Sequence, residues 1–599
     1  MRVYFAGPTR LAMSHIIEQA FRAICAERAS AYVIAGVLCT GWGTATAQSL
    51  EWARAFGGSA NDKGFCVATD DAGNVYTSGV FIGVVDMDPG AGVSTLTATG
   101  NSDHFVQKLD ASGDFIWAVH FAGASASAGE GTPVSVDPWG NVLVAGTFTN
   151  TVDLDPGPDT SEFSSVGGAD VFVVKLDASG GLIWARSWGG ASGNGDNVYA
   201  IACDSAGNVI TTGTFWGIAD LDPGPGVVNL GVAGQASDVF VQKMDASGNL
   251  LWARGFGGIS GDQPGSVRID RAGNILAVGR FQETVDFDPG AGIHELVSAG
   301  LYDAFIQKLD ADGEFVWARR IGGDSFDFGN AVALDDQDDV LVTGSFFGFV
   351  DLDPGTGSDT LYSGGDVAGF VLKLAADGFY QWGRSLGKVD PDAILVDADG
   401  RVVTSGDFSQ SVDFDPGPGT GYLDSEGAGD IFLQRMDGSG IFISAQRFGG
   451  SLDESAGQSM ALAPSGALLM TGTFRGTVDL DPGPGTNTIV SSGFQDVLVM
   501  KLAGSSSGMA DLENVDALQV LPNPANDRVR IEVDDTLIGE RATIALFDAT
   551  GRRVLAEENR ALATLTEIAL PAQLHEGVYV LVLGAEGRAA RSARVVVKR

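Results

Sequence analysis

Short apolar runs separated by turn residues recur along most of the chain. In the first full copy of this pattern the runs are Val67–Asp70, Gly73–Phe81, Asp103–Asp110 and Gly113–Trp117. They are rich in Val, Ile, Leu, Phe and Thr, and clusters of the turn-forming residues Gly, Asn, Asp, Ser and Pro separate them. The intervals leave no room for a helix of ordinary length. The pattern predicts four short strands in each copy and an all-β chain.

The most constant part of the pattern is the phrase Asp-x-Asp-Pro-Gly, which we name the acidic phrase. It starts at Asp86, Asp153, Asp220, Asp286, Asp351, Asp413 and Asp479, at intervals of 62 to 67 residues. A fixed period of this kind is typical of repeat architectures. Four-stranded sheets with two apolar faces become stable when they pack radially against one another. The repeats therefore predict a seven-bladed β-propeller of four-stranded blades.

The repeat resembles that of bacterial seven-bladed β-propellers found in secreted proteins. Their pattern of Gly-Asn-Val-Tyr, Asp-x-Phe-Val-x-Lys-Leu and Gly-x-x-x-Trp stands almost literally at Gly73–Tyr76, Asp103–Leu109 and Gly113–Trp117. The period exceeds that of WD40 blades (about 40–45 residues) and of kelch blades (about 50). The resemblance covers about three quarters of the chain. It implies an architecture and leaves the activity open.

Tryptophans on the predicted fourth strands indicate how the ring closes. They stand at Trp52, Trp117, Trp184, Trp252, Trp317 and Trp382. Trp52 precedes the first complete unit, and the seventh unit ends at Leu502 without a fourth strand. We expect Leu50–Phe56 to complete the seventh blade beside Asp496–Leu502, which removes two exposed sheet edges. We expect the tryptophans to pack between blades rather than to stack on sugars.

Residues suited to catalysis are few and scattered. After the leader only His104, His120, His294 and His575 remain, in unrelated places, so no Ser/His/Asp or metal–His site is predicted. Cys66 and Cys203 fall on blades that do not touch, so no disulfide is expected. A lysine recurs on the third strands and is expected to bridge to an aspartate of its blade: Lys108, Lys175, Lys243, Lys308, Lys373 and Lys501.

The two ends of the chain differ from the repeats. At the N-terminus, Arg22 and Arg28 precede an apolar run, and Ala45–Ala47 matches a signal-peptidase site, so residues 1–47 are predicted to be a signal peptide. A start at Met13 instead of Met1 would shorten it. The repeats are assigned to a propeller at 48–503, followed by a Gly/Ser-rich linker at 504–515 and a small β-sandwich at 516–599. No later run reaches the length of about 20 apolar residues that spans a bilayer.

Four motifs of the last segment resemble the type A sorting domain of type IX secretion. They include Pro522, Asn523 and Pro524 at its opening, Gly551 in a central turn, and Gly577 and Tyr579 in a Leu-x-x-Gly-x-Tyr motif. The resemblance implies a Bacteroidota-type cell, export through the type IX machinery to the outer-membrane surface or beyond, and removal of the tail by a sortase-like protease. Attachment to surface lipopolysaccharide often follows. The alternative is an accessory β-sandwich without a transport role.

The acidic phrase is the strongest candidate for a binding site. Its loops should all emerge on one face, together with Asp62, Asp196, Asp262, Asp327 and Asp453 of the interblade loops. Paired carboxylates and turn carbonyls are the ligands that Ca²⁺ requires, but Pro-Gly also fits a tight turn in which Asp accepts backbone N–H groups. Weak calcium sites and structural turns both stay open. The candidate ligands are Asp86, Asp88, Asp153, Asp155, Asp220, Asp222, Asp286, Asp288, Asp351, Asp353, Asp413, Asp415, Asp479 and Asp481.

The net charge and the symmetry of the repeats reduce the number of function classes that fit this chain. Residues 48–509 carry a net charge of −39 of the −40 total, which repels nucleic acid and anionic lipid. We expect a binding or scaffold module without enzymatic activity, with an extracellular glycan or protein as partner. A hydrolase or lyase acting on extracellular glycans would need polar residues confined to a few blades. A surface-layer component is the third class. One break in symmetry is the shortened segment Leu386–Pro391, which opens the sixth unit.

Overall fold

The computed structural model of the chain is all-β, and the residues that it describes contain no helix. These residues are 48–123, 131–231, 236–452, 455–483 and 485–504, then 519–521, 528–532, 541–547, 553–562, 565–570, 574, 577–585 and 591–598. Within them, no helical segment has the length and apolar character needed to cross a membrane. Contacts divide the chain into two compact units, one spanning Ala47–Ser505 and the other containing Ser506–Arg599.

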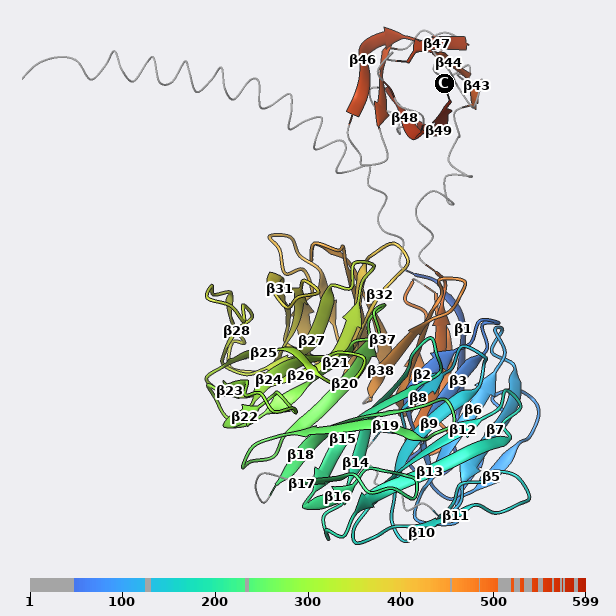
Figure 1. Cartoon of the computed structure of the whole chain (residues 1–599). Coiled ribbons are helices and arrows are strands. Elements are labelled where there is room, and N and C mark those ends of the chain that lie inside the picture. The colour runs from blue at the N-terminus through green and yellow to red at the C-terminus, as the bar shows by residue number, and fades with distance from the viewer. Residues whose placement is uncertain are drawn as a thin grey trace, which may run out of the picture. The chain divides into compact units, whose positions relative to one another are not determined.

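The first unit is a seven-bladed β-propeller of four-stranded antiparallel blades, as predicted (Figure 1). From the channel outward, the blades consist of β2 (Lys63–Thr69), β3 (Val75–Phe81), β6 (Asp103–Leu109) and β7 (Phe115–Phe121); β8 (Val134–Val136), β9 (Val142–Phe148), β12 (Asp170–Leu176) and β13 (Leu182–Gly190); β14 (Asn197–Cys203), β15 (Val209–Trp216), β18 (Ser237–Met244) and β19 (Leu250–Phe256); β20 (Gln263–Ile269), β21 (Ile275–Phe281), β24 (Asp303–Leu309) and β25 (Phe315–Gly323); β26 (Asp327–Leu334), β27 (Val340–Phe346), β30 (Ala368–Leu374) and β31 (Tyr380–Gly387); β32 (Val389–Val396), β33 (Val402–Phe408), β36 (Asp430–Met436) and β37 (Phe442–Gly450); and β38 (Ser455–Leu462), β39 (Leu468–Phe474), β42 (Asp496–Leu502) and β1 (Leu50–Phe56).

Burial along the strands follows from the radial packing. The middle strands β3 and β6 are buried at every residue, because neighbouring blades cover both of their faces. The outermost strand β7 is buried only at its last residue, Phe121. This is why the middle strands read as continuous apolar runs, whereas the outer strands mix apolar and polar residues. The core therefore lies between blades, in a series of clusters around the ring.

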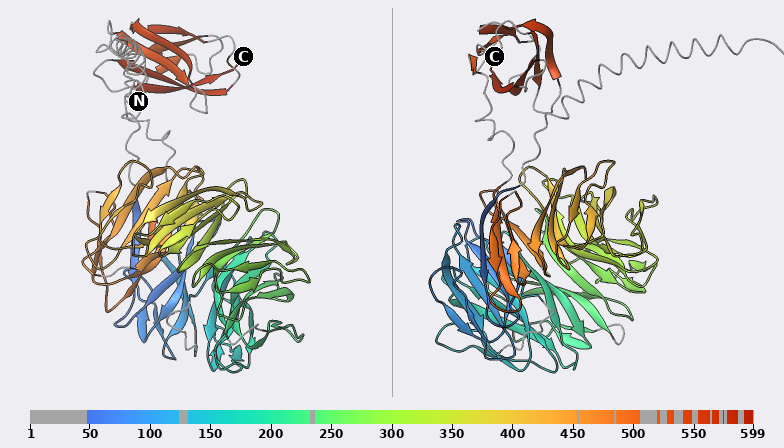
Figure 2. Two further views of the ribbon diagram at one scale, coloured as in Figure 1. Left: turned by 90° about the vertical axis from the view of Figure 1, so that its left-hand side faces the viewer. Right: turned by 180° about the vertical axis from the view of Figure 1, so that it is seen from behind.

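The N-terminal strand closes the ring. Strand β1 pairs antiparallel with β42, with Trp52 opposite Lys501 and Phe56 opposite Val497. It therefore supplies the fourth strand of the blade that contains the last repeat, and the closure prediction is confirmed. Figures 1 and 2 show this blue strand against the orange strands of the last blade. Because both partners are paired, neither leaves an open edge in the ring.

A two-stranded hairpin joins the second and third strands of every blade and carries the acidic phrase. The hairpins are β4 (Val84–Asp86) with β5 (Thr95–Thr97), β10 (Thr151–Asp153) with β11 (Glu162–Ser164), β16 (Ile218–Asp220) with β17 (Asn229–Gly231), β22 (Thr284–Asp286) with β23 (Glu295–Val297), β28 (Phe349–Asp351) with β29 (Thr360–Tyr362), β34 (Ser411–Asp413) with β35 (Tyr422–Asp424), and β40 (Thr477–Asp479) with β41 (Thr488–Val490). Strands β16, β28 and β40 pair with the outermost strand of the preceding blade. The acidic phrases thus lie at the outer edge of the propeller and not around its channel.

The outer-strand tryptophans hold neighbouring blades together, which confirms their predicted role. Trp184 donates its Nε1–H to the carbonyl oxygen of Ala246 in the next blade, at 3.1 Å. Arg186, two residues on, donates from Nε to the carbonyl oxygen of Gly248 at 2.9 Å. The same contacts are made by the pairs Trp52/Arg54, Trp252/Arg254, Trp317/Arg319 and Trp382/Arg384.

Five of the six recurring lysines bridge to an aspartate of their own blade, as predicted, whereas Lys501 pairs with a glutamate. The Lys175 ammonium lies 2.8 Å from Asp137 Oδ2, and both side chains are buried. It also donates to the Ala246 carbonyl of the next blade, at 3.2 Å. Although burial alone would raise the pKa of Asp137, the hydrogen bonds from Lys175 and Asn141 lower it overall. Corresponding ion pairs join Lys108 to Asp70, Lys243 to Asp204, Lys308 to Asp270, Lys373 to Asp335 and Lys501 to Glu51.

Pairs of buried carboxyls, which we name the seam carboxyls, form a further contact between blades. Asp196 of an interblade loop faces Asp170, which begins the third strand of the preceding blade. Gly190 N–H donates to Asp196 Oδ2 at 2.7 Å, and Gly189 must be glycine because a Cβ there would lie 2.3 Å from Asp170 Oδ1. The other seam carboxyls are Asp62 with Asp496, Asp262 with Asp238, and Asp327 with Asp303. These loop aspartates are therefore buried instead of lining the acidic phrases, and Asp453 lies outside the described residues.

Burial raises the pKa of at least one carboxyl in each of these pairs. The pKa reaches about 7 for Asp170, about 7 for Asp262 and about 8 for Asp327. The second carboxyl of each pair raises the value further, because two negative charges at one buried place repel each other. Several of these groups therefore hold a proton near neutral pH in the folded chain.

The described strands of the C-terminal unit form two sheets. One is β43 (Gln519–Leu521), β44 (Arg528–Glu532) and β47 (Leu565–Ala569), and the other is β46 (Arg553–Ala561), β45 (Arg541–Phe547), β48 (Gly577–Ala585) and β49 (Arg591–Val597). Fully buried side chains come from both sheets, including Val529, Ile531, Ile544 and Leu546. This agrees with the predicted β-sandwich. Of the sorting-motif residues, Gly577 and Tyr579 lie on β48, whereas Pro522, Asn523, Pro524 and Gly551 lie outside the described residues.

Candidate functional site

The acidic phrases form closed turns held by their own carboxylates. Asp86 Oδ1 accepts the backbone N–H groups of Asp88 at 3.1 Å and Ser94 at 2.8 Å. Asp88 Oδ1 accepts the N–H of Gly90 at 2.8 Å. Between them, Met87 is fully buried, and its carbonyl oxygen accepts a hydrogen bond from Gln107. The carboxylate-to-backbone contacts recur in the other six units.

This geometry accounts for the phrase as a turn motif. One oxygen of each carboxylate is already occupied by backbone N–H groups, so the Oδ2 atoms are the ones left for an ion. Among the residues that the structure describes, no three His, Cys, Asp or Glu side chains group closely enough to hold a metal. Ca²⁺ prefers six to eight oxygen ligands. A calcium site built on these residues would need carbonyl or water oxygens as well, and it stays a prediction.

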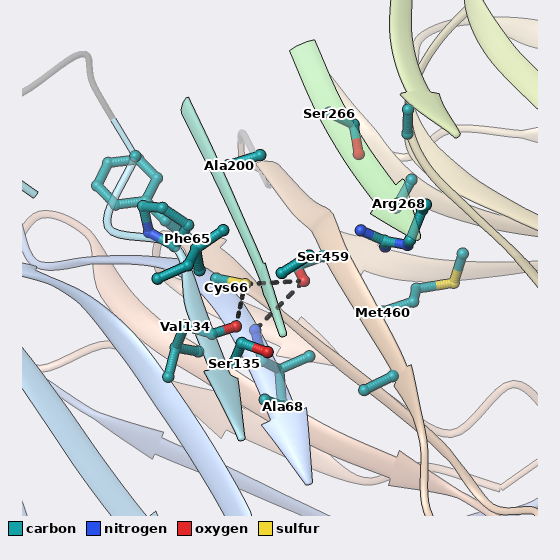
Figure 3. A pocket seen from close by; sticks show the side chains of 18 of the residues that line it. Phe65, Cys66, Ala68, Val134, Ser135, Ala200, Ser266, Arg268, Ser459 and Met460 are labelled. Atoms are coloured by element: carbon teal, nitrogen blue, oxygen red, sulfur yellow. Dashed lines mark hydrogen bonds between the residues drawn. The ribbon is translucent and has the colours of Figure 1, made fainter. Parts of the chain in front are cut away.

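The central channel offers a second candidate site. The innermost strand of every blade contributes to a cavity of about 500 Å³ (Figure 3). A further hollow of about 440 Å³ lies where these strands begin, on the side of the interblade loops. We name this hollow the channel mouth. Cys66 lines the channel, where Ser459 Oγ donates to its Sγ at 3.6 Å, and both Cys66 and Cys203 are free thiols, which confirms that they form no disulfide.

A β-bulge interrupts the innermost strand at the same place in six blades. The bulged residues in five of them are Phe65, Tyr199, Gly265, Asn330 and Asp392, which all line the channel and which we name the channel ring. In the last blade the bulge falls between Ala456 and Ser459. Bulges re-aim side chains and are common next to functional sites. Whereas many core and turn residues of the repeat are shared between blades, this position is aromatic in two blades, glycine in one, an amide in one and a carboxyl in one.

Blades four and five add aromatic groups at the channel mouth. The Arg280 guanidinium lies 4.7 Å from the centre of the Phe328 ring and 5.2 Å from that of Tyr302. Tyr302 also stacks on Phe326, with ring centres 6.0 Å apart. Arg280 and Phe328 line the mouth together with Gln263. Aromatic faces next to a few converging polar groups are typical of ligand sites.

The shortened segment of the sixth unit also lies beside the mouth. It leads into β32, on which Asp390 and Asp392 stand two residues apart. Asn330 donates from Nδ2 to the carbonyl oxygen of Pro391 at 2.8 Å, and Ser345 Oγ donates to Asp390 Oδ1. Burial, and then the neighbouring Asp390, raises the pKa of Asp392 to about 8. The mouth thus holds a carboxyl that is harder to ionise than an ordinary aspartate.

Sequence reasoning did not identify the channel ring. Polar residues confined to a few blades are what an enzymatic site would need, and Asn330, Asp392 and Arg280 are such residues. A signal was present: each ring residue stands five positions before the aspartate of the following turn, as with Phe65 before Asp70. That column changes from blade to blade, whereas the turn and core residues around it largely repeat. Without the fold, variation there could not be told from neutral drift.

Comparisons with known proteins bear mainly on the C-terminal unit. Residues 519–598 match the sequence model of the family described as the secretion system C-terminal sorting domain. The chain is therefore a seven-bladed propeller that carries a type IX sorting domain, and this domain implies secretion to the cell surface or outside. A curated relative, an uncharacterized WD repeat-containing protein of Acanthamoeba polyphaga mimivirus, is 27% identical over 144 residues, or 20% of this chain. The match spans 10% of the length of that relative.

Solved structures with similarity to the chain include a protein of unknown function from Bacteroides caccae. It is 13% identical with a TM-score of 0.26, and the match covers 57% of this chain and 94% of that one. PorZ, a surface component of the type IX secretion system of Porphyromonas gingivalis, is 13% identical with a TM-score of 0.22, over 90% of this chain and 81% of that one. Export is inferred from the sorting-domain match alone.

Proposed function

We propose that the mature protein is a secreted or cell-surface binding module that takes an extracellular ligand at the mouth of its central channel. One observation carries this proposal. The propeller repeats its structural residues in blade after blade, but the channel ring changes from Phe65 to Tyr199, Asn330 and Asp392. A position that packing does not constrain can vary freely, and here it varies where a ligand would meet all blades at once.

The chemistry of the mouth fits a saccharide. Rings such as Phe65, Tyr199 and Phe328 offer apolar faces to the C–H groups of a sugar. Gln263, Asn330 and Asp392 offer donors and acceptors for its hydroxyl groups. An extracellular glycan is therefore the favoured partner class, ahead of a protein.

A glycan array probed with the mature chain tests this proposal. Tyr199→Ala and Phe328→Ala should each weaken binding about tenfold or more, because truncating a central aromatic contact often removes over 1 kcal/mol. The matched control is Phe379→Ala, whose ring is 67% exposed in a turn outside the mouth. If the two mouth variants bind every glycan as the wild type does, the mouth is not the site. Self-association that rises with concentration, without any glycan bound, would favour a surface-layer component instead.

We further propose that residues 1–47 are a signal peptide and that the C-terminal unit directs passage through the type IX machinery. In this proposal a sortase-like protease then removes the tail, with or without attachment to lipopolysaccharide. The support is the match of residues 519–598 to the sorting-domain family. A chain that ends at Ser505 should fold but stay in the periplasm. Its appearance on the cell surface in normal amounts would contradict the proposal.

A glycan hydrolase or lyase is the second candidate, and the pair Asp390 and Asp392 favours it. A pair of nearby carboxyls can serve as general acid and general base. The raised pKa of Asp392 suits the acid. Release of reducing sugar from a glycan that binds, and its loss in Asp392→Asn with binding retained, would establish this activity. If the glycan binds and is not cleaved, the protein is a binding module and not a hydrolase or lyase.

A further inference from the structure

One charged side chain stands deep in the channel, below the channel ring. The residues one position before the end of the innermost strands are Ala68, Ser135, Ala202, Arg268, Ala333, Leu395 and Ala461. Six of the seven are small or apolar, and Arg268 is the exception. Packing cannot require an arginine there, because the corresponding position of the other blades does without one. Arg268 is therefore a departure from the repeat of the same kind as the channel ring.

Arg268 is directed at the cavity and lacks an acidic partner. Its side chain points from β20 into the channel (Figure 3). It donates from Nη1 to the carbonyl oxygen of Val267, within its own strand, at 2.9 Å. Among the residues that the structure describes, no carboxylate lies within 4.0 Å of its guanidinium. Every lysine of the third strands, by contrast, is paired with an acidic side chain.

The surroundings make this an attractive site for an anion. The neighbouring lining residues include Ala68, Ile269, Ile394 and Met460, which solvate a charge poorly. The Arg268 side chain is itself exposed to the channel, so its guanidinium is open to an incoming ligand, and it stays charged at physiological pH. A guanidinium matches a carboxylate with two parallel hydrogen bonds.

The net negative charge of the propeller limits which anionic ligands can enter the channel. Residues 48–509 carry −39, so a ligand with many negative charges is repelled along its approach. A ligand with one acidic group and a neutral remainder meets much less repulsion. Its acidic group can lie at Arg268 while its neutral part lies among the rings of the mouth, because the mouth and the deeper cavity share Phe65, Tyr199 and Asn330.

We infer that Arg268 is an anion receptor for the carboxylate of a singly acidic saccharide, such as one that ends in a uronic acid. This inference rests on the proposed function of the mouth and adds the chemical class of the ligand. No covalent step is involved. Arg268 selects the ligand by charge, and the channel ring contacts the sugar.

The test compares saccharides that differ in one group. Binding of D-glucuronate and of D-glucose to the full mature chain is measured by calorimetry at equal ionic strength, with NaCl added to the glucose samples. Wild type should bind glucuronate at least about tenfold more tightly, and Arg268→Gln should lose that preference. The matched control is Arg271→Gln on the same blade, whose side chain is 62% exposed and pairs with Asp336 outside the channel. It should bind as the wild type does.

Thermal unfolding gives a readout that does not depend on the glycan array. Glucuronate should raise the Tm of wild type above the value in glucose with NaCl, and Arg268→Gln should show no such difference. Equal binding of the two sugars by wild type, or an unchanged preference in Arg268→Gln, overturns the inference while binding at the mouth can still hold. A glucuronate preference that survives Tyr199→Ala and Phe328→Ala unchanged would instead overturn the proposed mouth and leave the Arg268 site standing.

Discussion

At the outer edge of the propeller the same side chains make the same contacts in blade after blade, whereas the channel wall changes from one blade to the next. The edge repeats its acidic phrases, and Trp184 and Lys175 have counterparts around the ring. Along the channel, the bulge position holds Phe65 in one blade and Asp392 in another. Both regions come from the same repeated unit, so their difference is informative.

The difference follows from what each region contacts. A residue at the edge faces a neighbouring blade of similar sequence, so the same contacts serve most seams; the sixth blade, with Ser444 and Arg435 at the Trp and Lys positions, is the exception. A ligand in the channel faces several blades together and needs different groups from each of them. Repetition therefore marks structural demand in this protein, and departure from repetition marks candidate function.

Loss of the strand that closes the ring should lower the free energy of unfolding more than any other change considered. Deleting residues 48–56 removes β1, in which Trp52 and Phe56 are buried, and leaves β42 as an open edge. We expect a loss of at least about 5 kcal/mol or aggregation, since each buried aromatic side chain contributes about 3–5 kcal/mol. Urea unfolding measures it. A chain that lacks residues 506–599, which belong to the other unit, should keep its midpoint. An unchanged midpoint for the deletion of 48–56 would mean that β1 does not close the ring.

Removal of a buried lysine from its ion pair should give the second-largest loss of stability. Lys175→Met leaves Asp137 as a buried carboxylate without its cation, so the free energy of unfolding should fall by about 3 kcal/mol or more. The control is Lys388→Met, because the side chains of Lys388 and its partner Asp366 are 52% and 65% exposed. That variant should lose less than about 1 kcal/mol. Equal losses in the two variants would show that the repeated lysine is not special to the blade seam.

The seam carboxyls should make stability depend on pH. The folded pKa values of Asp170 and Asp262, about 7, and of Asp327, about 8, lie above the ordinary value of 3.8. The folded chain therefore holds more protons than the unfolded chain between these values, and stability falls as pH rises from about 4 to 8. The loss should be at least on the order of 1 kcal/mol for each carboxyl.

Carboxylates whose pKa is lowered in the folded chain make the protein less stable at acidic pH. The lowered pKa of Asp137 stabilises the fold above pH 3.8, and this contribution is lost as the pH falls through the folded value. The maximum should therefore lie near pH 4–5. Thermal unfolding at fixed ionic strength from pH 4 to 8 checks it, and Asp327→Asn should flatten the slope. A Tm that is constant over this range would show that the seam carboxyls ionise normally.

Added calcium should change the free energy of unfolding the least. A weak site that is half occupied adds about 0.4 kcal/mol to the free energy of unfolding. Millimolar CaCl₂ should raise the Tm slightly more than NaCl of equal ionic strength. Asp88→Asn keeps an oxygen for the Gly90 N–H and removes the charge, so it should reduce that difference without breaking the turn. Identical shifts in the two salts would leave the acidic phrase as a turn motif alone.

The sequence by itself determined the number of blades, the closure of the ring by Leu50–Phe56 and the roles of Trp184 and Lys175. These follow from local periods and from turn chemistry, which act over a few residues and recur often enough to be counted. It also indicated the sorting domain, because short motifs there keep their order. In each case the relevant neighbours are set by the repeat itself.

Only the tertiary structure decided which residues meet in the channel. Phe65, Asn330 and Asp392 are far apart along the chain, and a bulge turns each of them toward the same cavity. Their convergence depends on the closure of all seven blades, which no local pattern expresses. The same holds for Asp170 and Asp196, whose burial arises because one blade covers the edge of the next. Local sequence patterns thus specified the repeated blades. The closure of the ring decided which of the non-repeated residues face the channel together.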